Sequence, residues 1–385
     1  MLKNRGKMRI VYLSDTIARF GGIERVFVDK MNFLTEEYGH EIFLITSSQK
    51  NHKLLFPPSP KIRHIDLGIN FHSLYQYHTP IRLWMMCKLN RLYKKRLKKA
   101  IRDIKPDFII TETRWKASLV CNLPVEGKKI IESHLAKAYT GEAETRGKSF
   151  LKKAIALFIQ RRTFHSIVKK CDIFVTLTQG DATDWNIPHK THVIPNPFTI
   201  YPDCHSRLTA KKIISVGRLD WQKGYDMLID VWRKVYAAHP DWQLHIYGNG
   251  PDQEFLEQKV NEHKLGGSLF IHPSQLSIYE KYLESSIYVM SSRYEGFGLV
   301  LVEAMACGLP CVSFDCPYGP ADIIKNGEDG FLIENNHIGQ MAEKINYLIE
   351  NESERFRMGE QARENVRRFS KENIMKKWDR LFRSL

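Results

Sequence analysis

The sequence lacks the features that mark secreted, zinc-binding and membrane-spanning proteins. Its 385 residues contain no apolar run of the roughly 18 to 20 residues that a membrane-crossing helix needs. Its seven cysteines form no C-x-x-C pair and show no zinc-ligand spacing, so we expect free thiols. The basic amino terminus lacks the apolar core of a secretory signal, which predicts a cytoplasmic protein.

Positive charge is concentrated in one half of the chain. Residues 1–200 contain 35 Lys and Arg against 17 Asp and Glu, whereas residues 201–385 contain 23 against 26. A basic half beside a near-neutral half is typical of a protein that meets an anionic surface on one side.

Two segments contribute about half of that basic charge. Residues 81–105 contain ten Lys or Arg and one acidic residue, and residues 148–170 contain seven and none. The first segment interleaves apolar residues with the basic ones, namely Trp84, Met85, Leu89, Leu92 and Leu97. Basic amphipathic helices can lie on anionic membranes, although such a face can also be solvated on a helix that packs on its own sheet. We expect these segments to bind the cytoplasmic face of the inner membrane.

The two halves each open with a strand, a glycine turn and a helix, in "MRIVYLSDTIARFGGIERVF" and "KKIISVGRLDWQKGYDMLI". Short apolar runs alternating with helical stretches then follow, as in parallel sheets. The pattern predicts an α/β protein of two Rossmann-like doubly wound domains that face a cleft, residues 1–200 and 201–365. We expect residues 366–385 to form a helix that packs back on the amino-terminal domain. Ligands of such sheets bind beyond the carboxyl ends of the strands.

Glycines and cations follow the first strand of each half. Gly21 and Gly22 precede a helix, where backbone amides can approach an anion, although a plain tight turn explains them equally well. Arg218 and Lys223 follow the strand of the second half. They can clamp a diphosphate, or they can be solvated surface cations.

Two glutamates flank an apolar run in "SRYEGFGLVLVEAMACGLP". Glu295 lies in the predicted loop, and Glu303 lies about five residues into the predicted helix, roughly 7 Å along its axis at ~1.5 Å per residue. This separation favours contacts to two parts of one extended polar ligand over acid and base groups at one bond. Gly296 and Gly298 would open the start of the helix to a phosphate. Local pairing within an amphipathic helix is the alternative for Glu303.

This E-x7-E stretch resembles the retaining GT-B glycosyltransferases of the large family often called family 4, of the bacterial polysaccharide and lipid-linked saccharide type. The resemblance covers roughly residues 8–335 and includes, in the order of the family, "FGGIER", "VIPNP", "SVGRLDWQKGYDMLI", "IYGNGPD" and "DCPYGPADIIKNGEDGFLI".

The resemblance implies a role for each candidate site residue. Glu303 would bind the ribose hydroxyls of a nucleotide sugar, and Glu295 would bind hydroxyls of the transferred sugar. Arg218 and Lys223 would hold the diphosphate. His134 would lie near the reacting sugar, with a buried structural histidine as the alternative. The remaining donor contacts would come from Gly21, Gly22, Gly248, Gly296, Phe297, Gly298, Leu299 and Val300.

The implied reaction moves a hexose or N-acetylhexosamine, with retention, from a nucleoside-diphosphate sugar to a saccharide or lipid-linked saccharide in surface polysaccharide biosynthesis. Arg218, Lys223 and a helix N-terminus can stabilise the leaving diphosphate. No Asp-x-Asp is present, so we expect no metal cofactor. UDP is favoured over GDP, although Pro273 and Ser274 stand where relatives carry a glycine near the base.

Two other classes of function compete with this interpretation. One is a GT-B-like nucleotide-sugar epimerase that uses no saccharide acceptor. The other is a nucleic-acid-binding protein, which the positive charge alone suggests. The sequence contains no RRM, KH or zinc pattern, so we expect no nucleic-acid partner.

Overall fold

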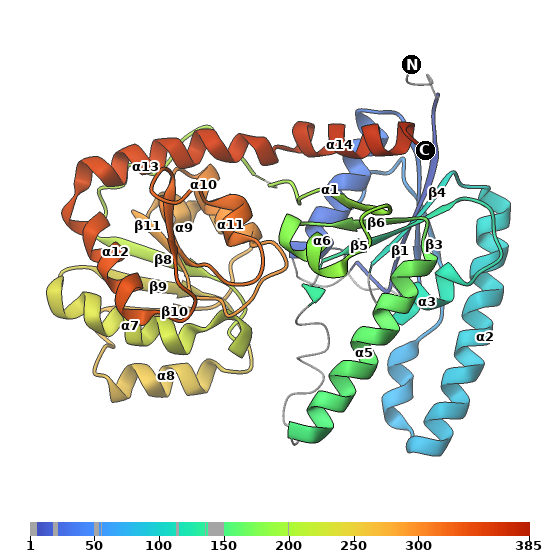
Figure 1. Cartoon of the computed structure of the whole chain (residues 1–385), viewed down its shortest axis with the longest axis horizontal. Helices are drawn as coiled ribbons and strands as arrows, with labels where there is room; N and C mark the ends of the chain where they lie inside the picture. The colour runs from blue at the N-terminus through green and yellow to red at the C-terminus, as the bar shows by residue number, and fades with distance from the viewer. Residues whose placement is uncertain are drawn as a thin grey trace. The chain divides into compact units, whose positions relative to one another are not determined.

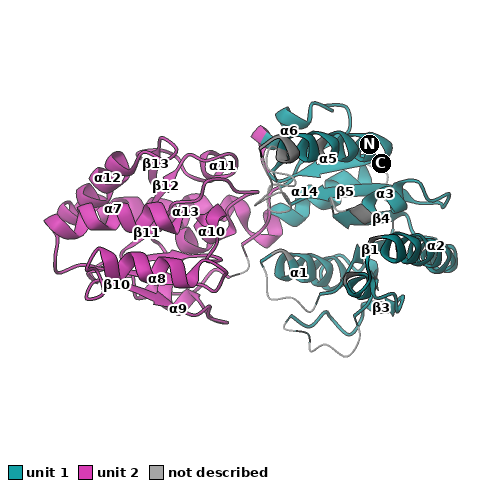
Figure 2. Ribbon diagram, turned by 90° about the horizontal axis from the view of Figure 1, so that it is seen from below, with its two compact units in different colours: residues 1–177, 181–194, 374–385 teal, residues 178–180, 195–373 magenta. Residues whose placement is uncertain are grey.

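The computed structural model describes residues 6–17, 22–49, 54, 56–112, 115–134, 136–137, 150–198 and 200–385. Contacts between residues divide the chain into two units (Figure 2). Unit 1 consists of residues 1–177, 181–194 and 374–385, and unit 2 consists of residues 178–180 and 195–373. Unit 2 thus begins before the expected residue 201, because the backbone N–H of Phe198 donates to the Phe369 carbonyl, 3.0 Å away.

Unit 1 is built on a parallel sheet of seven strands in the order β3-β2-β1-β4-β5-β6-β7. The strands are β1 (Arg9–Ser14), β2 (Glu41–Thr46), β3 (Arg63–Asp66), β4 (Phe108–Glu112), β5 (Lys128–Ser133), β6 (Ile173–Thr176) and β7 (Thr191–Val193). The helices are α1 (Gly22–Glu36), η1 (Phe71–Gln76), α2 (Thr79–Ile104), α3 (Trp115–Cys121), α5 (Phe150–Lys170) and α6 (Gln179–Trp185), whose first residues belong to unit 2.

Unit 2 is built on a parallel sheet of six strands in the order β10-β9-β8-β11-β12-β13. The strands are β8 (Lys212–Val216), β9 (Gln243–Tyr247), β10 (Leu269–His272), β11 (Ile287–Met290), β12 (Cys311–Phe314) and β13 (Gly330–Ile333). The helical elements are η3 (Trp221–Lys223), α7 (Tyr225–Ala238), α8 (Gln253–Glu262), α9 (Tyr279–Leu283), α10 (Leu299–Ala306), α11 (Pro320–Ile323), α12 (Ile338–Glu350), α13 (Glu352–Asn365) and η4 (Val366–Phe369), followed by α14 (Lys371–Arg383) (Figure 1).

Both units are doubly wound α/β folds of the predicted kind. The strands that the sequence indicates most clearly are buried on both faces, as in β11, where all four residues are buried. Strands β3, β7 and β13 are edge strands of their sheets. The sequence does not reveal β3 and β7, because their residues are exposed or half-buried and form no apolar run. The strand order reverses at β1 and β4 in unit 1 and at β8 and β11 in unit 2, and this is where such folds bind ligands.

Helix α14 is strongly amphipathic, and residues 374–385 belong with unit 1. Its apolar residues recur at the spacing of one helical face, and all are buried: Ile374, Met375, Trp378, Leu381 and Phe382. The Phe382 ring lies 4.8 Å from that of Phe108 in β4, measured between centroids. None of the helices within the described ranges is long and apolar enough to cross a bilayer.

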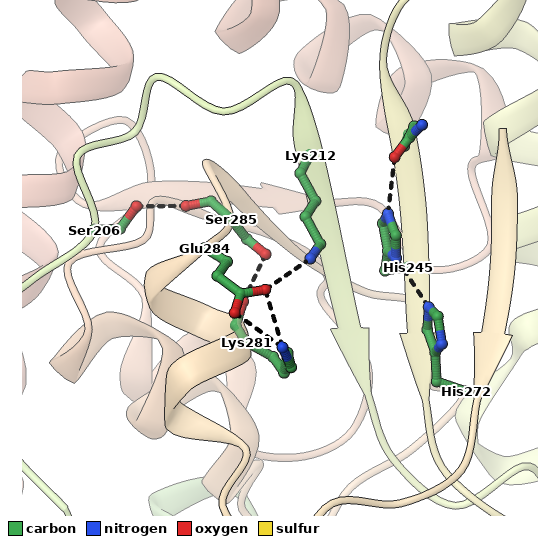
Figure 3. A network of polar contacts seen from close by, with 8 residues as sticks. Ser206, Lys212, His245, His272, Lys281, Glu284 and Ser285 are labelled. Carbon is green, nitrogen blue, oxygen red and sulfur yellow. Dashed lines mark hydrogen bonds and ion pairs between the residues drawn. The ribbon is translucent and has the colours of Figure 1, made fainter.

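Two histidines, one in β9 and one in β10, lie next to one another on one face of the sheet of unit 2 (Figure 3). His245 Nδ1 lies 2.9 Å from His272 Nε2, and His245 Nε2 lies 3.2 Å from Gln243 Oε1. Burial, followed by the nearby charge of Lys212 and by His272, lowers the pKa of His245 to about 4. Lys281 lowers it further, whereas Glu284 opposes the shift.

Acidification is expected to destabilise unit 2 through this pair. Between pH 6.5 and about 4 the unfolded chain binds a proton at His245 that the folded chain excludes, so stability falls as the pH falls through this window. We expect His245→Phe to remove about 1 kcal/mol of the stability lost between pH 7 and pH 4.5, allowing for solvent screening. Urea denaturation at several pH values measures this slope, and an unchanged slope in the variant would contradict the assignment.

Candidate functional site

The site in unit 2 lies where the strand order reverses, between neighbouring strands β8 and β11. The loop after β8 carries Arg218 and Lys223, and the loop after β11 carries Glu295. The carboxyl ends of parallel strands meet at one edge of the sheet, so these two loops lie side by side. The Ser291 hydroxyl donates to the Lys223 carbonyl at 2.9 Å, which ties one loop to the other.

Lys223 and Glu295 form a hydrogen-bonded ion pair across the two loops. Lys223 Nζ lies 2.6 Å from Glu295 Oε1, and the Ser292 hydroxyl donates to the same oxygen at 2.6 Å. The two charged side chains are 18% and 7% exposed, respectively. Burial acts to lower the pKa of Lys223, but the Glu295 carboxylate outweighs it and raises that pKa. Lys223 is therefore a permanent cation held beside a carboxylate.

Arg218 is the exposed cation of the site. Its side chain is 71% exposed, and its Nε lies 3.6 Å from Asp220 Oδ2. Burial raises the pKa of Asp220, while the charges of Arg218 and Lys223 oppose that rise. Asp220 caps the short helix η3, accepting a hydrogen bond from the backbone N–H of Lys223. Arg218 is therefore exposed enough to reach an anionic ligand, and Asp220 keeps its hydrogen bond to the Lys223 amide if the arginine moves.

Gly248 brings the turn after β9 against the loop after β8. A Cβ atom at this position would lie 1.9 Å from the carbonyl oxygen of Gly217, so only glycine fits. The backbone N–H of Gly217 donates to the Tyr247 carbonyl at 3.1 Å, and that of Leu219 donates to the Asn249 carbonyl at 3.0 Å. Close packing against Gly217 therefore explains the glycine at position 248 without any ligand.

Helix α10 begins directly after the glycine stretch that contains Gly296 and Gly298. Gly298 is the N-cap residue with a φ of 94°, a left-handed conformation that favours glycine, and no side chain caps the helix. The first backbone amides of an α-helix have no partner within the helix, so those of Leu299 and Val300 can donate to an anion. Phe297 contributes backbone only, because its ring is buried 5.4 Å from that of Phe369.

Glu303 lies in the second turn of α10 and is half-buried. Burial, followed by the charge of Glu303, raises the pKa of the Tyr282 hydroxyl, which places the carboxylate near that ring. Glu295 and Glu303 therefore come from a loop and a helix of one unit, as the sequence predicts.

The other candidate residues belong to unit 1. Gly22 is the first residue of α1, and Gly21 lies outside the described residues. His134 follows β5, and its side chain is 4% exposed. Its Nε2 lies 3.2 Å from Glu132 Oε2, within reach of a hydrogen bond, whereas Nδ1 has no hydrogen-bond partner among the described residues. A buried ring nitrogen without a hydrogen bond is costly unless a ligand or water completes it.

Sequence reasoning missed several residues that support the site. Ser292 stands three residues before Glu295, a spacing that allows its hydroxyl to reach the carboxylate. Asn249 and Ser274 form reciprocal hydrogen bonds between the turns after β9 and β10, at 2.7 and 3.3 Å. Ser274 thus has a structural partner at the position where the sequence departs from the family pattern. Within the described ranges, no group of three or more His, Cys, Asp or Glu side chains could hold a metal ion.

The chain is similar to known proteins over most of its length. Residues 203–365, all within unit 2, match the family model described as glycosyl transferases group 1. An uncharacterized glycosyltransferase of Haemophilus influenzae is 29% identical over 378 residues, covering 96% of this chain and 98% of the relative.

Two other relatives align over shorter stretches. The amylovoran biosynthesis glycosyltransferase AmsD of Erwinia amylovora is 35% identical over 56% of this chain and 66% of its own. The poly(ribitol-phosphate) alpha-N-acetylglucosaminyltransferase of Staphylococcus aureus is 35% identical over 46% of this chain and 36% of its own.

Solved structures share the fold over nearly the whole chain. A variant of S. aureus TarM in complex with fondaparinux, alpha-GlcNAc-glycerol and UDP superposes with a TM-score of 0.77 at 16% identity, covering 98% of this chain and 100% of the other. Anabaena HepE in complex with UDP and glucose gives 0.76 at 18% identity, with coverage of 98% and 100%. These likenesses define a GT-B fold.

A GT-B fold with a group 1 match over most of unit 2 defines an enzyme that transfers glycosyl groups. The chain is a glycosyltransferase, and its residues 203–365 are similar to the glycosyl transferases of group 1.

We expect the buried Lys223–Glu295 ion pair to contribute more to the free energy of unfolding than an ion pair on the surface of unit 2. Lys223→Met leaves the Glu295 carboxylate buried beside a single hydroxyl donor, and we expect it to cost about 3 kcal/mol in the free energy of unfolding. Lys211→Met removes the partner of Asp241 on the surface and should cost much less, because water screens both charges. Chemical denaturation measures both, and equal losses would show that the Lys223 pair is not a buried one.

Proposed function

We propose that this glycosyltransferase transfers a hexose or N-acetylhexosamine, with retention of configuration, from a UDP-sugar to a saccharide or lipid-linked saccharide in surface polysaccharide biosynthesis. The observation that carries the proposal is the convergence of Lys223, Glu295 and the uncapped start of α10 at the strand reversal of unit 2. Arg218 adds an exposed cation at the same strand ends.

Each group has a chemical part in the proposed donor site. Arg218, Lys223 and the first amides of α10 hold the diphosphate and stabilise its growing charge as it leaves. These cations are expected to do so without a metal ion. Glu303 accepts hydrogen bonds from the ribose, and Glu295 accepts them from the transferred sugar. For unit 1 we propose that Gly22 contacts a phosphate or the acceptor, and that His134 contacts a hydroxyl of the reacting sugar.

The hydrogen bonds of Glu295 fix the position of its carboxylate. Its Oε1 accepts from both Lys223 and Ser292, so one oxygen is already saturated, and the other stays available for a sugar hydroxyl. This fits a front-face route, in which the departing phosphate helps to deprotonate the acceptor. One relative is named an alpha-N-acetylglucosaminyltransferase, and an α-linked product from an α-linked nucleotide sugar retains configuration.

Calorimetric titration with UDP, GDP and their sugars tests the donor site. We expect tighter binding of UDP than GDP, and a loss of about 10- to 150-fold in UDP affinity in Glu303→Ala, because a charge-assisted hydrogen bond of about 1.5–3 kcal/mol is removed. Glu262→Ala, on α8 away from the strand ends, is the matched control. Preference for GDP would overturn the base assignment. Conversion of a UDP-sugar without any acceptor would favour an epimerase.

We further propose that unit 1 binds an anionic membrane on the cytoplasmic face through the amino-terminal ends of α2 and α5. Both ends extend away from the sheet on the same side of the unit (Figure 1). They expose large apolar side chains to solvent: Ile81, Leu83, Trp84, Met86, Ile155, Phe158 and Ile159. Leu89, Leu92 and Leu97, by contrast, pack into the core of unit 1, so this later part of α2 uses its apolar face internally.

Charge favours lipid as the occupant of these exposed ends. The outward face of α2 carries Arg82, Lys88, Arg91, Lys94, Lys95 and Lys99, all exposed. Basic residues near an anionic surface contribute about 1 kcal/mol each, and exposed aromatic side chains add hydrophobic insertion. Trp84 and Phe158 are 63% and 64% exposed, which is unusual for such large apolar groups.

Co-sedimentation with phosphatidylglycerol vesicles tests the membrane surface. Trp84→Asp and Phe158→Asp are each expected to lower partitioning about tenfold or more, because each removes an inserting aromatic side chain. The matched control is Phe255→Asp on α8 of unit 2, where the ring is 57% exposed but lies outside the basic segments. Equal partitioning of wild type and both unit 1 variants would rule out insertion at these ends.

A further inference from the structure

Unit 1 contains a buried ion pair that the proposed donor chemistry does not use. Lys30 of α1 places its Nζ 2.7 Å from each carboxylate oxygen of Glu132 in β5. The two side chains are 2% and 1% exposed. The Trp378 ring of α14 covers the Lys30 amine, with its centroid 4.1 Å from Nζ. Three segments that are distant in the sequence therefore meet at one charged contact.

A buried ion pair is weak support for stability, because apolar residues of similar volume often stabilise a core equally well. Its chemical consequence here is a permanent negative charge. Burial acts to raise the pKa of Glu132, but the charge of Lys30, followed by His134, lowers that pKa to about 2. Glu132 is therefore a carboxylate, and thus only an acceptor of hydrogen bonds, across the physiological pH range.

One of the two oxygens that Lys30 contacts, Oε2, also faces His134. Glu132 Oε2 lies 3.2 Å from His134 Nε2, two residues along the chain at the carboxyl end of β5. A carboxylate beside one ring nitrogen favours the tautomer that carries its proton there, which leaves the other nitrogen as an acceptor. The other nitrogen, Nδ1, is buried and has no hydrogen-bond partner in the described part of the chain.

We propose that Lys30 and Glu132 are positioning residues for His134. Glu132 holds the proton of the imidazole on Nε2 and fixes the ring, so that Nδ1 accepts a hydrogen bond from a hydroxyl of the saccharide. Lys30, covered by Trp378, keeps Glu132 ionised in a buried site where a lone carboxyl group would take up a proton. This inference rests on the proposed placement of His134 near the reacting sugar.

The alternative is that the pair only holds α1 against β5. The two roles predict different behaviour in Glu132→Gln, which keeps the shape of the side chain but loses its charge. A purely structural pair would lower stability without touching the ring of His134. A positioning pair would also change which nitrogen carries the proton, and would lower the rate of transfer at an unchanged donor affinity.

The experiment compares Glu132→Gln and Lys30→Met with Val28→Ala, a buried position on α1 two residues from Lys30 that serves as the matched destabilising control. Nitrogen NMR of histidine-labelled protein reports the His134 tautomer, with His134→Gln assigning the signal. We expect the Nε2–H form in wild type and Val28→Ala, and its loss in the two charge variants. Transfer assays should show kcat lowered about 10- to 100-fold in the charge variants only.

Each outcome decides between the two roles. An unchanged His134 tautomer in Glu132→Gln, or a kcat no lower than that of Val28→Ala at matched stability, would overturn the positioning role. An unaltered kcat in His134→Gln would overturn it too, because no function would remain for the ring to serve. Failure of the wild type to bind any nucleotide sugar would instead refute the proposed function, and the NMR comparison would still decide the tautomer.

Discussion

The Lys223–Glu295 ion pair is the interaction on which the carboxyl-terminal site depends. It joins the loop after β8 to the loop after β11, and these are the two strands between which the strand order reverses. A parallel sheet brings the ends of these strands together, but it does not fix the loops beyond them. The short contact between Nζ and Oε1, reinforced by Ser292, does so. The cation that would meet a diphosphate and the carboxylate that would meet a sugar are thus positioned by one another.

Each unit contains a lysine–glutamate ion pair that joins two of its segments. In unit 1 the pair joins a helix to a strand, and in unit 2 it joins two loops. Both pairs place a lysine amine within 2.7 Å of a glutamate oxygen near the carboxyl ends of the strands. The difference lies in exposure: the Lys30 pair is sealed from water, whereas the Lys223 side chain is 18% exposed and can reach a ligand.

Much of the fold could be predicted from the sequence, because buried central strands leave unbroken apolar runs. Strand β11 is such a run, whereas the edge strands β3 and β7 contain only exposed and half-buried residues and therefore give no apolar signal. The positions of Glu295 and Glu303 in a loop and a helix follow from the glycine stretch between them. The distances between their side chains and their partners do not, because these depend on loops that the tertiary structure sets.

Long-range partners were the part that the sequence could not reveal. A glutamate inside the apolar run "KIIESH" indicates that some cation is buried beside it, yet Lys30 stands 102 residues away, in a helix whose sequence shows no sign of a buried charge. The exposed residues of α2 raise the converse problem. Trp84 and Leu97 are both large apolar residues interleaved with basic ones in the sequence. Only the packing of the helix shows that the first is exposed and the second buried.

Helix α14 begins within unit 2, but its residues from Ile374 onward belong to unit 1. A chimera of two relatives therefore cannot separate the two units with a single junction in the chain. A chimera that joins the first half of one enzyme to the second half of another at residue 194 would bring in a foreign residue at position 378 above Lys30. Chimeras that also take residues 374–385 from the parent of unit 1 would keep the indole over the amine and the native core intact.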